Sequence, residues 1–253
     1  MTFERRRYGK DNYLYLLAEG GDAALVDPGD PEVALELLRE VGARPRFILH
    51  THGHADHTGG SAKLRQALGA TVVGHGADAD RFPLDSDVEG VPSLRLGTLE
   101  VRVHAVPGHT PGSVLYEWKG RLLTGDTLFW GGCGNCRHGG DPARLADSFL
   151  GTIAHLDEGL EVHPGHDYAA ANLPFVLDLE PGNEAASRRL DEVQAARRSG
   201  AEPESSRLGQ ERAVNPFLRA GSHSVREALR RRGLSPEDPR GAFLALRRLR
   251  DAW

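Results

Sequence analysis

Four potential metal ligands crowd into the segment 51–57, which reads THGHADH. They are His52, His54, Asp56 and His57. The apolar run 46–50 before them predicts a β-strand, and the apolar spacing over 57–68 predicts a helix that ends at Gly69. The cluster is therefore expected on a loop between a strand and a helix, where α/β folds commonly place their chemistry.

The order of these ligands suits two neighbouring metal ions. On an extended or looped backbone, His52 and His54 point the same way because side chains alternate from one residue to the next. Asp56 and His57 then turn toward an adjacent position. Imidazole and carboxylate together suit zinc, iron or manganese. A histidine-rich surface loop that binds no metal is the alternative.

Three further ligand candidates each follow an expected strand and stand in a glycine-rich turn. They are His109 in 107–113 (PGHTPGS), Asp126 in 124–127 (TGDT) and His166 in 163–168 (HPGHDY). Glycine lets the backbone approach a metal closely and turn sharply behind the ligand. Each histidine alone is more typical of a structural role. Together with the cluster at 51–57, the set favours metal binding.

The pattern of expected elements changes along the chain. Strands are expected at 12–18, 23–26, 46–50, 71–73, 94–96, 99–106, 113–118, 121–124 and 159–162, and helices at 31–41, 57–68, 143–155 and 169–179. This order predicts sheets covered by helices. After 180–183 (EPGN) no clear strand remains, 199–209 reads as a loop, and helices are expected at 184–198, 224–232 and 240–253. We therefore expect a catalytic domain at 1–169 and a helical region at 170–253.

Composition argues against several classes of protein. The 31 Lys and Arg against 36 Asp and Glu give a net charge of −5, which disfavours a general nucleic-acid-binding protein. No segment approaches the roughly 20 apolar residues that span a bilayer. The charged segment 1–11 does not read as a signal peptide. We therefore expect a cytoplasmic protein without a nucleic-acid or membrane partner. The oligomeric state is left open, with a monomer favoured. Cys133 and Cys136 are expected to be plain thiols, because no second pair completes a tetrahedral zinc site.

The ligand motifs, taken in order, resemble the metallo-β-lactamase superfamily. Five further segments look like the hydroxyacylglutathione hydrolase (glyoxalase II) family within it: 124–134 (TGDTLFWGGCG), 166–168 (HDY), 172–173 (NL), 180–183 (EPGN) and 215–219 (NPFLR). The last two lie outside the metal motifs and are specific to this subfamily. The resemblance implies an α/β fold, a four-layer αββα sandwich, followed by a helical substrate-binding region.

The resemblance also implies a ligand set. One metal would take His52, His54 and His109, the other would take Asp56, His57 and His166, and Asp126 would bridge the two. Asp56 and Asp126 would thus be the carboxylates at the reaction centre. Asp27 would orient a ligand loop, as carboxylates behind metal ligands do, or would instead belong to the first turn of the helix at 31–41.

The implied contacts with glutathione match the family only in part. Tyr168 follows the last metal ligand, and Arg247 and Arg250 match a C-terminal pair of basic residues. Their alternative is a solvated basic helix face. Asn135 stands where the family has a basic residue, and Arg137 is in a position to restore the lost charge.

The activity implied is hydrolysis of a glutathione thioester. Two divalent ions, zinc or alternatively iron or manganese, would activate water to attack S-D-lactoylglutathione and release a 2-hydroxy acid, in the second step of methylglyoxal detoxification. The main alternative is a glutathione persulfide dioxygenase that uses a single Fe(II). Its relatives share nearly the same ligands, but the segments EPGN and NPFLR favour the hydrolase. The thiol-recognition residues argue against a lactonase or β-lactamase, the net charge argues against a nuclease, and the full set of ligands argues against a non-catalytic binding module.

Overall fold

Two six-stranded mixed sheets form the centre of the computed structural model, which describes residues 1–253. The first sheet has the order β1 (Thr2–Tyr8), β2 (Asn12–Glu19), β3 (Asp22–Val26), β4 (Phe47–Leu49), β5 (Thr71–Gly74) and β6 (Ser86–Asp87). The second has the order β14 (Ser206–Arg207), β13 (Glu161–Pro164), β10 (Arg121–Gly125), β9 (Val114–Trp118), β8 (Leu99–Ala105) and β7 (Ser93–Leu96). A short hairpin, β11 (Leu128–Phe129) and β12 (Gly132–Cys133), stands apart from both sheets.

The alternation of side chains along β2 shows how the layers pack. Tyr13, Tyr15 and Leu17 join a core shared with residues of the second sheet, and Leu14 and Leu16 join a separate core beneath helices. Successive side chains of a strand point to opposite faces, so one apolar strand serves both cores. The two sheets therefore pack face to face.

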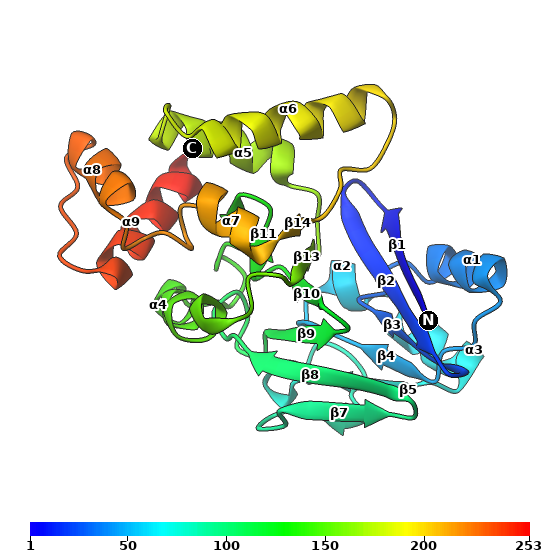
Figure 1. The fold of residues 1–253 in the computed structure, drawn as a ribbon. Coiled ribbons are helices and arrows are strands. Elements are labelled where there is room, and N and C mark those ends of the chain that lie inside the picture. Colours follow the sequence, from blue (N-terminus) through cyan, green and yellow to red (C-terminus); the bar gives the residue numbers. More distant parts are fainter.

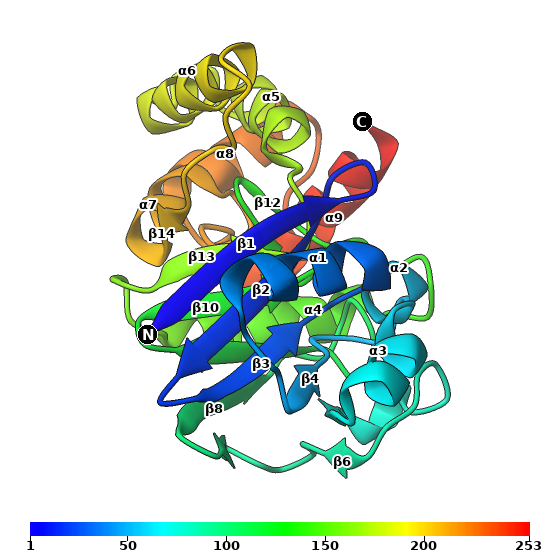
Figure 2. The same cartoon turned by 90° about the vertical axis from the view of Figure 1, so that its right-hand side faces the viewer.

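Helices cover the outer faces of the sandwich (Figures 1 and 2). α1 (Pro31–Val41), α2 (Ala55–Thr58) and α3 (Ser61–Leu68) lie on the side of the first sheet, and α4 (Pro142–Asp147) lies on the side of the second. The remaining helices form a layer at one end, namely α5 (Ala169–Leu179), α6 (Glu184–Arg198), α7 (Leu208–Val214), α8 (His223–Arg231) and α9 (Pro239–Ala252). The four-layer αββα sandwich with a helical C-terminal region is thus confirmed. None of these helices combines the length and apolar character needed to cross a membrane.

Local structure differs from the sequence prediction where tertiary contacts override it. The charged segment 2–8 forms the edge strand β1. Charged side chains on an edge strand disfavour pairing with other chains, so this strand lacks the apolar pattern by which strands are predicted. The helix expected at 57–68 is broken into α2 and α3 at Gly59 and Gly60. A Cβ on Gly60 would lie 2.2 Å from the carbonyl oxygen of Pro28, so the chain passes too close there for a regular helix bearing side chains.

Two more segments, both in the second half of the chain, differ from the prediction. The helix expected at 143–155 ends as α4 at Asp147 and continues as a π turn and a 3-10 turn. The segment 199–209, expected as a loop, contains the two-residue strand β14 and the start of α7. Strand β14 pairs with β13, so it is stabilised by a partner distant in the sequence.

Leu37 provides a test of the core beneath α1. The side chain is fully buried against the first sheet, whereas Leu35 on the same helix is only partly buried. Leu37→Ala is expected to lower the free energy of unfolding by about 2–5 kcal/mol, because a cavity remains where the side chain packed. Leu35→Ala, which deletes the same atoms, is expected to cost clearly less. Urea denaturation of both variants measures the difference, and equal losses would contradict this packing.

Candidate metal centre

The candidate ligands lie on loops that follow strands of both sheets. The loop 51–57 follows β4 of the first sheet. His109, Asp126 and His166 come soon after β8, β10 and β13 of the second sheet. Strands β10 and β13 are parallel, and β8 runs in the same direction because β9 is antiparallel to both β8 and β10. Their carboxyl ends therefore meet at one edge of the sandwich, where they face the loop from the first sheet.

One group of ligand atoms consists of three imidazoles and a carboxylate. His54 Nδ1 lies 3.0 Å from His109 Nε2, which lies 3.5 Å from Asp126 Oδ2. His52 Nε2 is 4.0 Å from the same Asp126 oxygen. His52, His109 and Asp126 are buried. These four side chains can hold one metal ion.

A second group lies beside the first. His57 Nε2 and His166 Nε2 are 3.1 Å apart, and both approach Asp56 Oδ2, at 3.6 and 3.3 Å. Asp56, His57 and His166 can hold another ion. The Asp126 carboxylate also borders this group, with Oδ1 at 3.4 Å from His57 Nε2 and Oδ2 at 3.4 Å from His166 Nε2. Asp126 therefore lies between the two groups.

The spacing and chemistry of these atoms fit divalent metals. Ligand atoms 2.0–2.1 Å from a tetrahedral zinc ion lie about 3.3 Å from one another, and most of the separations above are close to that value. His52 Nε2 and Asp126 Oδ1 are buried without a hydrogen-bond partner in the protein, which is costly for polar atoms unless a ligand satisfies them. The site thus supports divalent metal binding, whereas the assignment of single ligands to two ions stays a prediction.

The protonation states of His52, His109 and Asp126 suit metal binding. Burial would raise the pKa of Asp126, but the neighbouring His57 and His166 hold it well below its ordinary value. Burial lowers the pKa values of His52 and His109. Asp126 is therefore ionised and these two imidazoles are neutral at neutral pH, the states in which they bind metals. In the second group, burial opposes but the Asp126 carboxylate raises the pKa values of His57 and His166, so a metal must displace protons there.

Asp27 lies behind the candidate ligands and not in the first turn of α1, where Asp30 is the N-cap. Its carboxylate accepts hydrogen bonds from the backbone N–H and the hydroxyl of Thr51. The second oxygen also lies 3.4 Å from His57 Nδ1. Asp27 has a φ of 50°, a strained conformation for a residue with a side chain. The contacts orient the loop that carries His52 and His57.

Asp78 was missed by the sequence prediction. The buried carboxylate accepts hydrogen bonds from Gly53 N at 2.9 Å, from the Thr110 hydroxyl at 2.6 Å and from Gly112 N at 3.2 Å. Gly53 lies between His52 and His54, and Thr110 follows His109. Asp78 thus joins the two loops that supply the imidazoles of the first group. Nothing in its sequence surroundings marks it, because its partners are distant in the chain.

Asp11 and Asn12 were also missed, although Asp11 directly precedes the strand expected at 12–18 and Asn12 begins it. His166 Nδ1 lies 2.9 Å from Asp11 Oδ1, so this carboxylate orients the ring. Asn12 donates to Asp56 Oδ2 at 3.0 Å. Tyr13 N also donates to Gly165 O at 2.8 Å, which ties β2 of the first sheet to the turn that carries His166.

The predicted substrate residues line a single basic cavity of about 230 Å³. Asn135, Arg137, Tyr168, Arg247 and Arg250 all border it, together with Phe129, Cys133, Asn172, Asp251 and Trp253. A second cavity, of about 520 Å³, contains the metal centre and also borders Asn135 and Tyr168. The Tyr168 ring stacks on the ring of His166 at 4.7 Å between centroids. These two shared residues thus link the cavities.

The two C-terminal arginines differ in their surroundings. The buried Arg247 donates to the carbonyl oxygens of Cys133 at 2.9 Å and Gly134 at 3.2 Å, and pairs with Asp251. Arg247 also lines the basic cavity, and its contact with substrate stays a prediction. Arg250 is only partly buried, and its guanidinium lies over the ring of Trp253. It is free of carboxylate partners within ion-pair distance.

The two cysteines are free thiols, as predicted. Burial raises the pKa of Cys133 to about 11 and that of Cys136 to about 12. Both side chains are therefore protonated at neutral pH.

Comparison with known proteins identifies the class to which this fold and site belong. Residues 8–172 match the family model of the metallo-beta-lactamase superfamily, and residues 167–253 match that of the hydroxyacylglutathione hydrolase C-terminus. Hydroxyacylglutathione hydrolase from Anaeromyxobacter dehalogenans is 66% identical and covers 99% of both chains, and that from Alkalilimnicola ehrlichii is 41% identical and covers 95% of both. The chain belongs to the hydroxyacylglutathione hydrolase family of this superfamily. The meeting point of the two matches supports the division into 1–169 and 170–253, which stays a proposal.

Solved structures have the same fold. The crystal structure of ETHE1 from Myxococcus xanthus is 26% identical, with a TM-score of 0.69 over 100% of this chain and 99% of that one. The crystal structure of TTHA1623 in a di-iron-bound form is 28% identical, with a TM-score of 0.63 over 85% of this chain and 100% of that one.

Asp78→Asn tests the connection between the two loops of the first ligand group. The amide has only one acceptor oxygen for three donors, so the loops carrying His54 and His109 are expected to loosen while the second group is unaffected. Metal content after dialysis should fall toward one ion per chain. The exposed Asp80 provides the matched control, since Asp80→Asn makes the same chemical change two residues away. Equal metal content in both variants would contradict the role of Asp78.

Proposed function

We propose that this protein is a metal-dependent thioesterase that hydrolyses S-2-hydroxyacylglutathione, such as S-D-lactoylglutathione, to a 2-hydroxy acid and glutathione. This reaction is the second step of methylglyoxal detoxification. The observation that carries the proposal is the joining of a metal centre to a basic cavity through Asn135 and Tyr168. A thioester carbonyl fits the first cavity and the carboxylates of a glutathione group fit the second. The relatives named hydroxyacylglutathione hydrolase support the same activity.

The proposed centre would hold two divalent ions. His52, His54 and His109 would hold one, Asp56, His57 and His166 would hold the other, and Asp126 would contribute to both. The distances within each group support this assignment. When bound, the ions lower the pKa of water and polarise the substrate carbonyl. Zinc, iron and manganese all accept this ligand set, and the di-iron form of TTHA1623 supports iron as an alternative to zinc.

The chain's own residues orient the reacting groups. Asp11 holds the His166 ring, Asn12 holds the Asp56 carboxylate, and Tyr168 stacks on His166 at the passage between the cavities. The leaving group is a thiolate. Because a free thiol has a pKa of about 8.5, it departs without a strong general acid. The proposed reaction therefore needs no further acidic side chain near the sulfur.

Glutathione recognition is assigned mainly to Arg250, Tyr168 and Arg137. Arg137 donates to the carbonyl oxygen of Asp251 and borders the basic cavity, which supports its role in replacing the charge missing at Asn135. Arg247 lines the same cavity, and its guanidinium is held by the carbonyls of Cys133 and Gly134.

A glutathione persulfide dioxygenase is the second candidate. The structural similarity to ETHE1 over the whole chain favours it. The match of residues 167–253 to the hydroxyacylglutathione hydrolase C-terminus favours the thioesterase more strongly, because this region contributes part of the basic cavity. Oxygen uptake with glutathione persulfide, measured on the same preparation as thioester hydrolysis, separates the two activities.

The bridging carboxylate tests the thioesterase proposal directly. The wild-type protein should hydrolyse S-D-lactoylglutathione and contain two ions per chain. Asp126→Ala should lose bound metal and nearly all turnover, because it removes the one carboxylate that borders both ligand groups. The exposed Asp191 on α6 serves as the control, and Asp191→Ala should behave as wild type. Full activity of Asp126→Ala with two retained ions would show that the ligand assignment is wrong.

Arg250→Ala tests recognition of the thiol. Loss of a charge-assisted contact worth about 1.5–3 kcal/mol should raise KM for the glutathione thioester about 10- to 100-fold and change kcat much less. Arg248 on the same helix is exposed and outside the cavity, so Arg248→Ala removes an equal charge as the control. Steady-state kinetics distinguish the outcomes. An unchanged KM for Arg250→Ala would indicate a solvated helix face.

A further inference from the structure

The β11–β12 hairpin connects two parts of the metal centre. It begins just after Asp126, and Gly134 at its other end lies against the backbone of Asp126, where a Cβ would come within 2.0 Å of the Asp126 carbonyl oxygen. The next residue, Asn135, accepts a hydrogen bond through its carbonyl oxygen from His109 Nδ1 at 2.7 Å. The position of this hairpin therefore affects both the carboxylate between the ligand groups and one of the imidazoles.

The hairpin cannot provide hydrogen-bond partners for all of its own backbone N–H and C=O groups. Residues 128–134 are buried, yet β11 and β12 pair at only two positions, Leu128 with Cys133 and Phe129 with Gly132. Buried N–H and C=O groups that lack partners are costly, so other hydrogen bonds must replace those of a longer sheet.

Side chains of the helical C-terminal region supply these hydrogen bonds. Asn215 donates to the carbonyl oxygens of Gly132 at 2.8 Å and Phe129 at 3.3 Å. Glu211 accepts from Gly131 N at 2.8 Å. Asn172 and Arg247 donate to the carbonyl oxygens of Trp130 and Cys133, at 3.1 and 2.9 Å. The four side chains come from α5, α7, the residue after α7, and α9.

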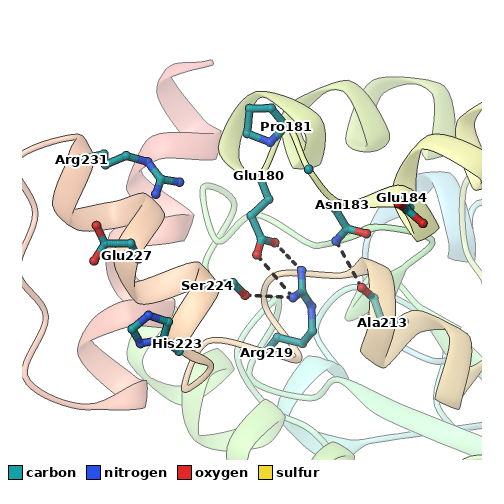
Figure 3. A pocket seen from close by; sticks show the side chains of 11 residues that line it. Glu180, Pro181, Asn183, Glu184, Ala213, Arg219, His223, Ser224, Glu227 and Arg231 are labelled. Atoms are coloured by element: carbon teal, nitrogen blue, oxygen red, sulfur yellow. Dashed lines mark hydrogen bonds and ion pairs between the residues drawn. The ribbon is translucent and has the colours of Figure 1, made fainter.

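Glu211 and Asn215 are themselves firmly held. Glu211 is buried, and its second oxygen accepts from the Ser206 hydroxyl. Asn215 is fully buried, and its own oxygen accepts from Phe217 N at 3.1 Å. Four residues further on, Arg219 pairs with Glu180 at the end of α5, beside a polar cavity of about 590 Å³ (Figure 3). The two segments EPGN and NPFLR thus connect α5, α7 and the hairpin.

We propose that Glu211 and Asn215 are positioning residues of the metal centre. Through the hairpin they fix the backbone next to Asp126 and the carbonyl that orients His109. Neither side chain borders the metal cavity or the basic cavity, so both act without touching substrate. The proposal rests on the ligand role of Asp126 in the proposed function. It assigns to the C-terminal region a second task besides contact with glutathione.

Asn215→Leu is the first test, since leucine keeps the number and branching of the side-chain atoms and removes the amide group that donates both hydrogen bonds to the hairpin. Metal release from the loaded protein to excess EDTA should become about 10-fold faster or more, as for other residues that support metal ligands. For the thioester, kcat should fall while KM stays within about twofold, because Arg250 and Tyr168 are unaffected. Val225→Ala on α8 is the control for stability, because this buried side chain is remote from the hairpin hydrogen bonds.

Glu211 provides a second pair of variants in case Asn215→Leu does not fold. Glu211→Ala leaves Gly131 N unpaired and should also release metal faster. Glu211→Gln should recover most of the retention, because an amide can accept from Gly131 N and donate to Ser206. The proposal is wrong if Asn215→Leu and Glu211→Ala lower the melting temperature but release metal no faster than Val225→Ala. In that case the hydrogen bonds only stabilise the fold. Release is measured with metal alone, so a wild type without thioesterase activity would refute the proposed function and leave this test valid.

Discussion

A buried carboxylate between two groups of imidazoles is the interaction on which the rest of this structure depends. Asp126 is buried at the edge where the two sheets meet, and His57, His109 and His166 all approach its oxygens within 3.5 Å. A buried charge of this kind is tolerated only when opposite charge and hydrogen bonds compensate it. Divalent metal binding, which the surrounding ligand groups support, provides such compensation. The loops, the two sheets and the C-terminal helices together hold this one carboxylate in position.

Support of this kind requires segments from the whole chain. The first sheet contributes the loop 51–57 and the residues Asp11 and Asn12 behind it, and the second sheet contributes the turns after β8, β10 and β13. Glycine permits the close approach of these segments: a Cβ on Gly165 would lie 2.4 Å from Asp126 Oδ1. The C-terminal helices complete the arrangement because their side chains form hydrogen bonds with the backbone of the buried hairpin that begins after Asp126. The same helices border the basic cavity, so the metal centre and this cavity share a scaffold.

Much of the candidate site was predictable because its signals are local. The spacing of His52, His54, Asp56 and His57, and the glycine turns around the other ligands, are visible in short segments of sequence. The strands and helices of the sandwich were largely predictable for the same reason. The edge strand β1 was not, since its charged residues carry no apolar pattern, and the helix at 57–68 was predicted unbroken because the contact of Gly60 with Pro28 depends on the fold.

The sequence by itself determined the chemistry of the ligands, the class of fold and the family. Only the tertiary structure decided which groups hold those ligands in place. Asp78 joins Gly53 to Thr110, Asn215 reaches Gly132, and Arg247 donates to the carbonyl oxygen of Cys133. Each of these hydrogen bonds joins residues far apart in the chain, and its energy depends on burial and on distances that exist only after the sheets and helices have packed. A local pattern specifies what a side chain can do, whereas packing decides which partner it meets.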